Sequence, residues 1–391
     1  MLNPDEQIEY KTPQVCDCGH SLEGVPSIQK TRQVFDIPRI TIKVTEHIGH
    51  ELVCPQCGKV HKAEFPAGVT QPVQYGENMM ALANYLTQYQ LLPLARTVEA
   101  IKDITGQHIS EGTLVNAAKT LSNQVESTVE AIKEQIISSN VVHFDETGMR
   151  CEGKTKWMHV ACTDKLTYYQ VHDKRGQTAI NDIAILPKIK GTAQHDHWKP
   201  YYSFSDCTHA ECDGHNLRYL KDIAENYHQD WATEMAGLLI GANRRVEELK
   251  LGGALEISQE EFTLWLQRYH KIIKAGILED AEKSPKVLNR RGEPKKSKAL
   301  QLLIKLQTYD IETLAFMADF EIDFTNNLAE RDLRMQKLRQ KISGCFRSDN
   351  GAKGFSRIRS YISTARKNGI SAMEAIIQAV KGNPFVPESM V

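Results

Sequence analysis

The 391-residue chain lacks two features that would place it in or across a membrane. No stretch approaches the run of about 20 apolar residues that a membrane-spanning helix needs. The amino end, MLNPDEQIEYKTP, has no basic start followed by an apolar segment, which argues against a secretory signal. We therefore expect a cytoplasmic protein with no membrane partner. Its nine cysteines should then be reduced and available to bind metal or to pack.

A marked overall charge is also missing, because the net charge is only −1. The basic side chains are instead gathered locally. Eleven Lys or Arg and two Asp fall between Arg331 and Lys367, and residues 283–298 hold seven basic side chains and one Glu. Such clusters indicate a surface that faces an anion, with an ordinary solvated basic helix as the alternative. We expect the Pro-containing segment 283–298 to be a loop.

Composition and periodicity divide the chain into five segments. They are a cysteine-containing module (1–65), a helical segment (66–140), a strand-rich segment (141–220), a second helical segment (221–320) and a basic helical tail (321–391). In the module, apolar residues that alternate between Val34 and Val44 predict short antiparallel strands. In the strand-rich segment, VVHFDET, KWMHVACT and TYYQVH are spaced like an antiparallel meander. A helix in QTAINDIAIL and a short strand in GTAQHDHW follow.

Two cysteine pairs flank the alternating stretch of the module. CDCG supplies Cys16 and Cys18, and CPQCG supplies Cys54 and Cys57. A Cys-x2-Cys-Gly turn directs two thiolates at one tetrahedral Zn²⁺, and the first pair has the less usual Cys-x-Cys spacing, so His20 could replace one ligand. The sequence predicts a structural zinc that stabilises a module too small to fold alone. Four unrelated thiols are the alternative.

The stretch LARTVEAIKDITGQHISEGTLVNAAKTL is typical of two helices joined by a short turn. Gly106 would supply the turn, and Ser110 followed by Glu111 suits the start of the second helix. This is the spacing of helix-turn-helix DNA-binding modules, although Lys119 is the main basic residue of the second helix. Any two packed helices around a turn would look the same.

Three carboxylates in separate segments suggest a site for divalent cations. VVHFDET reads as a strand that ends in Asp145, and TAQHDHW as a strand that ends in Asp196. Either Asp alone could be a turn residue. Together with Glu330, however, they could hold two Mg²⁺ ions about 3.5–4 Å apart, because hard cations prefer oxygen ligands and phosphate completes their coordination.

Glu330 has a second interpretation, in which Asn327 caps a helix and Glu330 closes a capping box. Helical spacing favours a ligand. Leu328, Met335, Leu338 and Ile342 would form a buried stripe, while Glu330 is followed on another face by cations. The side chains that we expect to contact DNA are Arg331, Arg334, Lys337, Lys341 and Arg347.

These motifs, in this order, resemble the transposases of bacterial insertion sequence 66. The likeness rests on HFDETGMR, KWMHVACTDKLTYYQVHDKRG, HDHWKPYY, CDGHNLRYL and DFTNNLAERDLRMQKLRQKISGCFRS, with the paired cysteines and QLLPLARTVEAI in support. The resemblance implies an α/β catalytic core of RNase H-like type, a mixed sheet flanked by helices. A helical insertion at about 221–320 would interrupt this core, which residues 321–391 complete.

The resemblance further implies a DDE triad made of Asp145, Asp196 and Glu330, with Mg²⁺ or Mn²⁺ as its metal. The reaction would be cleavage of DNA at the inverted-repeat ends of a mobile element, followed by transfer of the freed 3′-OH to target DNA. Such a protein would work near the bacterial nucleoid, as a homo-oligomer on DNA and with accessory transposition proteins. The family usually has a longer, coiled-coil-like amino-terminal region, and its absence here puts oligomerisation and full activity in doubt.

The stretch CTHAECDGH has the spacing of metal ligands. Cys207, His209, Cys212 and His215 could hold a second zinc. Related DDE enzymes have a similar Cys-x2-His after the second Asp, so we favour Cys212 and His215 as side chains that brace the site near Asp196. A plain helix is the third alternative. At the level of function, an inactive DNA-binding remnant or regulator and a nuclease that cuts without joining remain the competitors.

Overall fold

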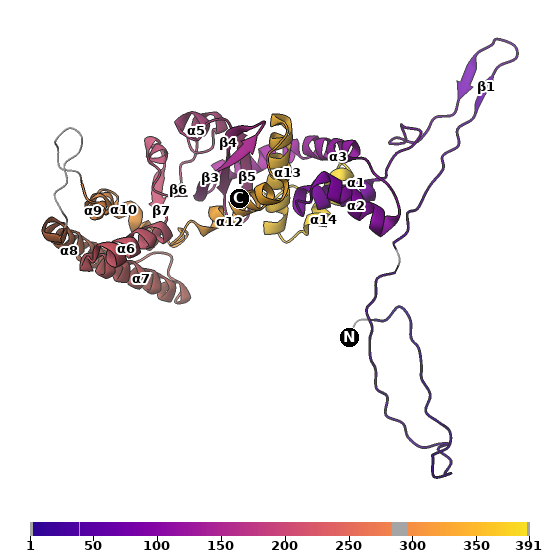
Figure 1. Ribbon diagram of the computed structural model, residues 1–391, viewed down its shortest axis with the longest axis horizontal. Helices are drawn as coiled ribbons and strands as arrows, with labels where there is room; N and C mark the ends of the chain where they lie inside the picture. Colours follow the sequence, from indigo (N-terminus) through magenta and orange to yellow (C-terminus); the bar gives the residue numbers. More distant parts are fainter. Residues whose placement is uncertain (1–2, 39, 284–295, 389–391) are drawn as a thin grey trace.

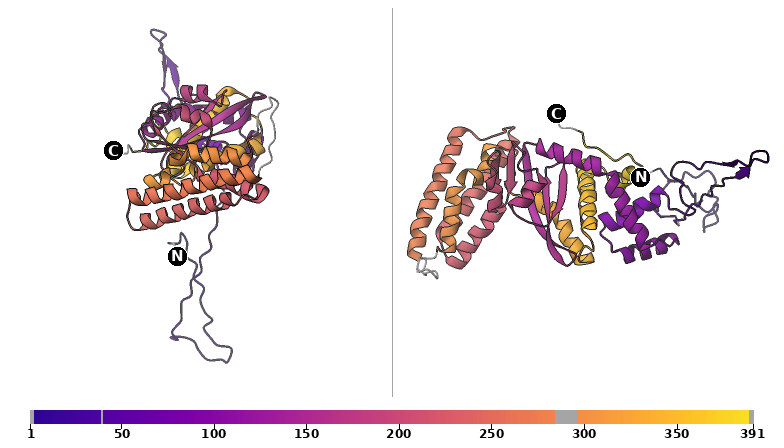
Figure 2. Two further views of the ribbon diagram at one scale, coloured as in Figure 1. Left: turned by 90° about the vertical axis from the view of Figure 1, so that its left-hand side faces the viewer. Right: turned by 90° about the horizontal axis from the view of Figure 1, so that it is seen from above.

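The structure is a computed structural model that describes residues 3–38, 40–283 and 296–388. The body is elongated, with a central sheet between an insertion of helices and the amino-terminal helices, from which residues before α1 extend away (Figures 1 and 2). Most of the predicted basic loop at 283–298 lies outside the described residues. Within the described part of the chain, no helix is both long and apolar enough to cross a membrane.

The central sheet has five strands in the order β5-β4-β3-β6-β7. They are β3 (Val141–Cys151), β4 (Lys154–Cys162), β5 (Thr167–His172), β6 (Thr192–His195) and β7 (Thr208–Glu211). β3, β4 and β5 form the predicted antiparallel meander, and β3, β6 and β7 run parallel. The sheet is therefore mixed, as expected.

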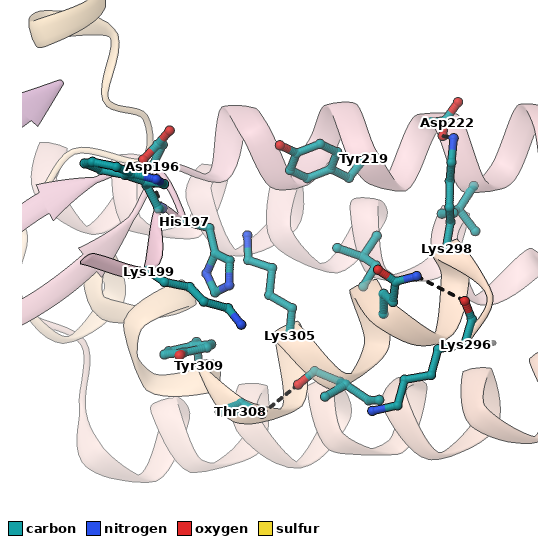
Figure 3. A pocket seen from close by; sticks show the side chains of 15 residues that line it. Asp196, His197, Lys199, Tyr219, Asp222, Lys296, Lys298, Lys305, Thr308 and Tyr309 are labelled. Atoms are coloured by element: carbon teal, nitrogen blue, oxygen red, sulfur yellow. Dashed lines mark hydrogen bonds and ion pairs between the residues drawn. The ribbon is translucent and has the colours of Figure 1, made fainter. Parts of the chain in front are cut away.

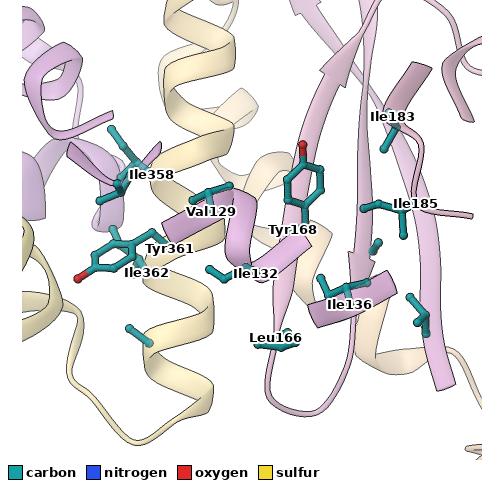
Figure 4. Packing of buried hydrophobic residues seen from close by; sticks show 14 of the residues in the cluster. Val129, Ile132, Ile136, Leu166, Tyr168, Ile183, Ile185, Ile358, Tyr361 and Ile362 are labelled. Carbon is teal, nitrogen blue, oxygen red and sulfur yellow. The ribbon is translucent and has the colours of Figure 1, made fainter. Parts of the chain in front are cut away.

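Helices cover both faces of the sheet. On one face, apolar side chains of α4 (Glu126–Ile137) pack between the sheet and α13 (Asp349–Lys367) (Figure 4). On the other face, α12 (Asn327–Ser343) packs on β3 and β4 through Ala329 and Leu333. The predicted helix after the meander is α5 (Gln177–Ile183), and η2 (Lys199–Ser203) follows β6.

The helix α13 also covers the exposed edge of β5. Ser360 and Thr364 lie one helical turn apart and are both buried. The Ser360 hydroxyl accepts a hydrogen bond from the Tyr169 backbone N–H at 2.8 Å, and that of Thr364 accepts one from Thr167 at 3.0 Å. Two side chains of a helix thus satisfy edge groups that would otherwise be free to pair with another strand.

A helical insertion separates β7 from α12 and has a core of its own, which includes Trp231 and Tyr269. Its helices are α6 (Asp213–Tyr227), α7 (Asp230–Leu251), α8 (Gln259–Lys283), α9 (Lys298–Thr308), α10 (Asp310–Thr313) and α11 (Ala315–Ala318). It lies beside β7, at one edge of the sheet.

The remaining helices gather at the opposite end of the body. They are α1 (Glu77–Asn84), η1 (Tyr85–Tyr89), α2 (Leu94–Thr105), α3 (Glu111–Gln124) and α14 (Ala372–Val380). The predicted helix–turn–helix is confirmed as a structure, with Gly106 in the left-handed region and Ser110 accepting the Thr113 N–H at 3.0 Å. α3 packs against α1, α13 and α14. Ser371 caps α14, where its hydroxyl accepts the Glu374 backbone N–H at 3.2 Å.

The strands predicted between Val34 and Val44 are not formed by the described residues there. The module instead has one hairpin, β1 (Glu51–Val53) with β2 (Val60–Lys62). Val34 is 93% exposed, so no partner sheet buries the alternating side chains. Alternation without a covering layer does not stabilise a strand.

The close approach of β3 and β6 requires a glycine. A Cβ at Gly191 would lie 2.1 Å from the Asn140 backbone carbonyl oxygen, which cannot move aside.

We expect Gly191→Ala to lower the free energy of unfolding by about 3 kcal/mol. Gly237→Ala is the matched control, because that position is exposed inside α7 with open space around it; it should stabilise by about 1 kcal/mol. Thermal unfolding of both variants measures these effects. Equal shifts in melting temperature would contradict a steric need for glycine at position 191.

Candidate active site

The register of the parallel strands places three of the candidate side chains side by side. His143 of β3 lies opposite Gln194 of β6, so two residues further on Asp145 comes opposite Asp196. His195 lies opposite Glu211 of β7, so Cys212 comes next to Asp196. Asp145, Asp196 and Cys212 therefore form a row at the carboxyl ends of the parallel strands, where ligands bind in open α/β sheets.

The prediction that β3 ends at Asp145 is wrong. β3 continues to Cys151, and Asp145 lies opposite Val160 in the antiparallel pair with β4. The difference arises because β3 continues beyond the end of its parallel partner β6 and stays paired with the antiparallel strand β4. Asp145 still lies level with the end of β6.

Glu330 comes to the same face of the sheet on the first turn of α12. Side chains alternate along β3, and Asp145 shares a face with Met149 and Cys151, on which α12 packs. Burial raises the pKa of Asp145 to about 7, with the charges of Glu146, Asp196 and Glu330 adding to the effect. Asp145 therefore lies close enough to Asp196 and Glu330 for their charges to raise its pKa.

A buried asparagine holds the start of α12 against the strands. The Asn326 side-chain amide donates to the Phe144 carbonyl at 2.7 Å, and its oxygen pairs with His143 Nδ1 at 3.0 Å. The Asn326 backbone N–H donates to Cys212 Sγ at 3.1 Å. One residue thus joins the strand that carries Asp145 to the end of β7, and nothing in the sequence pattern signalled it.

The capping-box interpretation of Glu330 is not supported. The N-cap residue of α12 is Asn326, not Asn327, and its side chain makes no capping hydrogen bond because it is turned toward the sheet. Glu330 lies one position beyond the place that a capping box requires. The carboxylate instead lies 3.7 Å from His215 Nδ1 and 3.8 Å from Arg218 Nη2.

The predicted buried stripe of α12 is wrong in its second half, because Leu328 and Met335 are partly buried against the core but Leu338 and Ile342 are not. The buried residues are Ala329, Leu333 and Gln336, whereas Leu338 is 51% exposed and Ile342 is 41% exposed. The helix is positioned partly by polar contacts, which a hydrophobic pattern does not show. The carboxylate of Asp332, in particular, accepts hydrogen bonds from Thr167 Oγ1 and from Lys367 Nζ, both at 2.8 Å.

Cys212 and His215 lie beside Glu330. Among the described residues, these three form the one group whose possible ligand atoms all lie within 4.8 Å of one another. His215 Nδ1 is 3.7 Å from Glu330 Oε1, and neither atom has a hydrogen-bond partner. Cys207 and His209 do not join them, because His209 bonds to His195 at 2.9 Å and to the Phe204 carbonyl at 2.8 Å.

Sequence reasoning missed a second cluster beside the row. Glu146 is buried on the opposite face of β3, where it accepts hydrogen bonds from Arg175 Nε at 2.7 Å and from the Tyr201 hydroxyl at 2.5 Å. The Arg175 guanidinium lies over the Trp198 ring at 4.2 Å. The Trp198 backbone N–H donates to Asp196 at 3.0 Å, so the cluster orients the loop that carries Asp196.

The basic residues of the tail fall into two groups. The five predicted DNA contacts are all exposed, and no ion pair is found for them in the described part of the chain. They are Arg331, Arg334, Lys337, Lys341 and Arg347. Others are structural: Arg339 lies 3.4 Å from the centre of the Phe346 ring, and burial lowers its pKa to about 10.

The donor atoms can be tested against the expected metals. Asp145, Asp196 and Glu330 offer carboxylate oxygens, the ligands that Mg²⁺ and Mn²⁺ prefer, and Glu330 Oε1 is buried without a partner. These residues fit a divalent cation, although their oxygens are not within 4.8 Å of one another among the described groups.

The thiols of the module form two separate turns. The Cys18 backbone N–H lowers the pKa of Cys16, and that of Cys57 lowers the pKa of Cys54. Each turn thus favours a thiolate, the form that binds zinc. The two pairs do not come together as one cluster of ligands in the described residues.

Comparison with known proteins identifies the class and then the family. A family model described as the zinc-finger binding domain of transposase IS66 matches residues 13–58, and one described as Transposase IS66 family matches residues 72–354. These matches place the chain among transposases. Since the longer match covers well over half of it, the chain belongs to the IS66 family, and the resemblance seen in the motifs is confirmed.

One similar protein comes from Sinorhizobium fredii and is described as the uncharacterized protein y4hP. It is 23% identical over 396 residues, which cover 93% of this chain and 70% of that protein. The likeness therefore extends over nearly the whole chain.

The raised pKa of Asp145 predicts a pH-dependent stability. Because the pKa is about 7 in the folded chain and near 4 in the unfolded chain, folding binds a proton in between, and stability falls as pH rises from 4 to 7. Asp145→Asn removes the ionisable group and with it this loss of stability. In metal-free buffer we expect the variant to be more stable than the wild type at pH 8, by up to about 4 kcal/mol, and the advantage to shrink at pH 5. Chemical denaturation at both pH values tests this, and a pH-independent difference would contradict it.

Proposed function

We propose that the chain is a DDE transposase that cleaves and joins DNA at the ends of an insertion sequence. Its core would be RNase H-like, with Asp145, Asp196 and Glu330 as the catalytic carboxylates. The register that sets Asp145 opposite Asp196, with α12 bringing Glu330 to the same face, is the observation that supports this most directly.

The carboxylates would act by holding two divalent cations, which activate the attacking oxygen and stabilise the leaving oxygen of the phosphodiester. Other residues of the chain hold these carboxylates in place. Asn326 fixes the start of α12 against β3, and Trp198 orients Asp196. Such preorganised ligands lower the cost of rearrangement during the reaction.

Exposed cations on α12 would guide DNA into the site. Arg334, Lys337 and Lys341 follow Glu330 at intervals of three or four residues, so they share its side of the helix. The two thiol turns of the module would bind a structural zinc once they approach each other, which would order residues that are largely exposed without it.

Replacing the third carboxylate tests the catalytic assignment. Glu330→Gln keeps the size of the side chain but weakens a metal ligand, so Mg²⁺-dependent cleavage of element-end DNA should fall about 10³-fold or more while DNA binding persists. Glu234→Gln, exposed on α7, is the matched control and should cleave normally.

A strand-transfer assay with precut ends completes this test. Joined products from the wild type would distinguish a transposase from a nuclease that only cuts. Binding without cleavage or joining would instead indicate a DNA-binding remnant, and undiminished cleavage by Glu330→Gln would remove Glu330 from the site.

The proposed DNA path makes a separate prediction about salt. Arg334→Ala combined with Lys337→Ala should weaken DNA binding and reduce the slope of log affinity against log salt by about 0.9 for each phosphate that the variant no longer binds. Lys271→Ala combined with Lys274→Ala removes the same charge from the exposed side of α8 and should leave the slope unchanged. Fluorescence anisotropy at several salt concentrations measures both, and equal slopes for the two variants would refute the path.

A further inference from the structure

A groove of about 720 Å³ opens beside Asp196, between the loop after β6 and the insertion (Figure 3). α6 contributes Tyr219 and Asp222 to it, and α9 contributes Lys298 and Lys305. Asp196 itself lines the groove, so the groove opens directly beside one of the three candidate carboxylates. None of the five exposed cations of α12 and its following loop belongs to its lining.

Positive charge lines the groove from two elements, η2 and the start of α9. Lys199 follows β6, and Lys296 and Lys298 lie at the start of α9; all three are exposed. Lys298 is 3.9 Å from Asp222, while for Lys199 and Lys296 no ion pair is found within the described ranges. Lys305 is different, because it is half-buried and held by Glu211 at 3.0 Å. Two lysines that form no ion pair among the described residues therefore line the groove beside Asp196.

An aromatic ring completes the wall. Tyr219 is 49% exposed, and no ring–ring contact is found for it among the described residues. Its ring lies 5.7 Å from Lys305 Nζ. Tyr309, by contrast, is already packed against Tyr202, with ring centres 4.4 Å apart. An exposed ring among cations is the arrangement on which proteins stack the bases of unpaired strands.

We propose that this groove binds about two unpaired nucleotides of DNA next to the phosphate held at the carboxylates, with Tyr219 stacking on a base and Lys199 and Lys296 binding the backbone. A cavity of this size holds a ligand of a few tens of atoms. The inference rests on the proposed function, and it adds that the DNA is locally unpaired when it reacts and that the insertion holds the unpaired part.

Binding of a short single strand to the full chain tests the proposal. The probes are a fluorescein-labelled oligothymidylate of about six nucleotides and a blunt duplex of the same length. Tyr219→Ala should weaken binding of the single strand about tenfold, whereas Tyr219→Phe keeps the ring and should bind like the wild type. Binding of the duplex should change less than about twofold in either variant.

The lysines provide a second test. Lys199→Ala combined with Lys296→Ala should weaken single-strand binding and lower its salt slope by about 0.7 for each phosphate that the variant no longer binds. Lys271→Ala, exposed on α8 and outside the groove, is the control. It should change neither the affinity for the single strand nor the salt slope. Melting temperatures equal to that of the wild type show that the variants fold.

The outcomes separate this inference from the proposed function. Unchanged single-strand binding in Tyr219→Ala, or an equal loss for the duplex, overturns the groove assignment and leaves cleavage by the carboxylates standing. Selective loss of single-strand binding, together with undiminished cleavage by Glu330→Gln, supports the groove and overturns the triad.

Discussion

The parallel pairing of β3 with β6 is the constraint on which the candidate site depends. It brings together residues about fifty positions apart in the chain and sets Asp145 opposite Asp196. The pairing is possible because Gly191 lets the start of β6 approach the Asn140 carbonyl, to which the Thr192 N–H donates at 2.7 Å. A shift of register by one residue would turn one of the two carboxylates to the opposite face of the sheet.

The same face carries a second constraint, the buried contact of Asn326. α12 returns to the sheet only after the whole insertion, and its few apolar contacts alone would leave its start loosely defined. The amide of Asn326 satisfies groups on two consecutive residues of β3, His143 and Phe144, immediately before Asp145. Burial lowers the pKa of His143, which disfavours the charged form of the ring. Because a buried polar group is costly when unpaired, such a contact specifies one position of the helix.

The sequence predicted the parts of this structure that depend on local pattern. The meander, the helix after it and the cap of α3 follow from alternation and from a single capping residue. The end of β3 was misplaced because its extension depends on β4, a tertiary partner. The buried side of α12 was misplaced because a polar anchor, Asn326, and a small residue, Ala329, orient the helix where apolar spacing suggested larger side chains. The basic tail shows the same limit, because charge counts cannot tell a cation that faces solvent from one that is used inside the fold. Arg359, for example, is 8% exposed and lies over the Tyr89 ring at 5.2 Å.

A buried carboxylate makes the insertion part of the site. Glu211, at the end of β7, accepts hydrogen bonds from His197 of the loop that carries Asp196 and from Asn216 of α6, and it pairs with Lys305 of α9. Burial opposes its ionisation, yet the hydrogen bond from His197 and the charge of Lys305 hold its pKa at about 2. Breaking one partner would leave a buried charge uncompensated, at a cost of about 3–5 kcal/mol. These contacts connect the loop that carries Asp196 with α6 and α9, the two helices that form the groove wall.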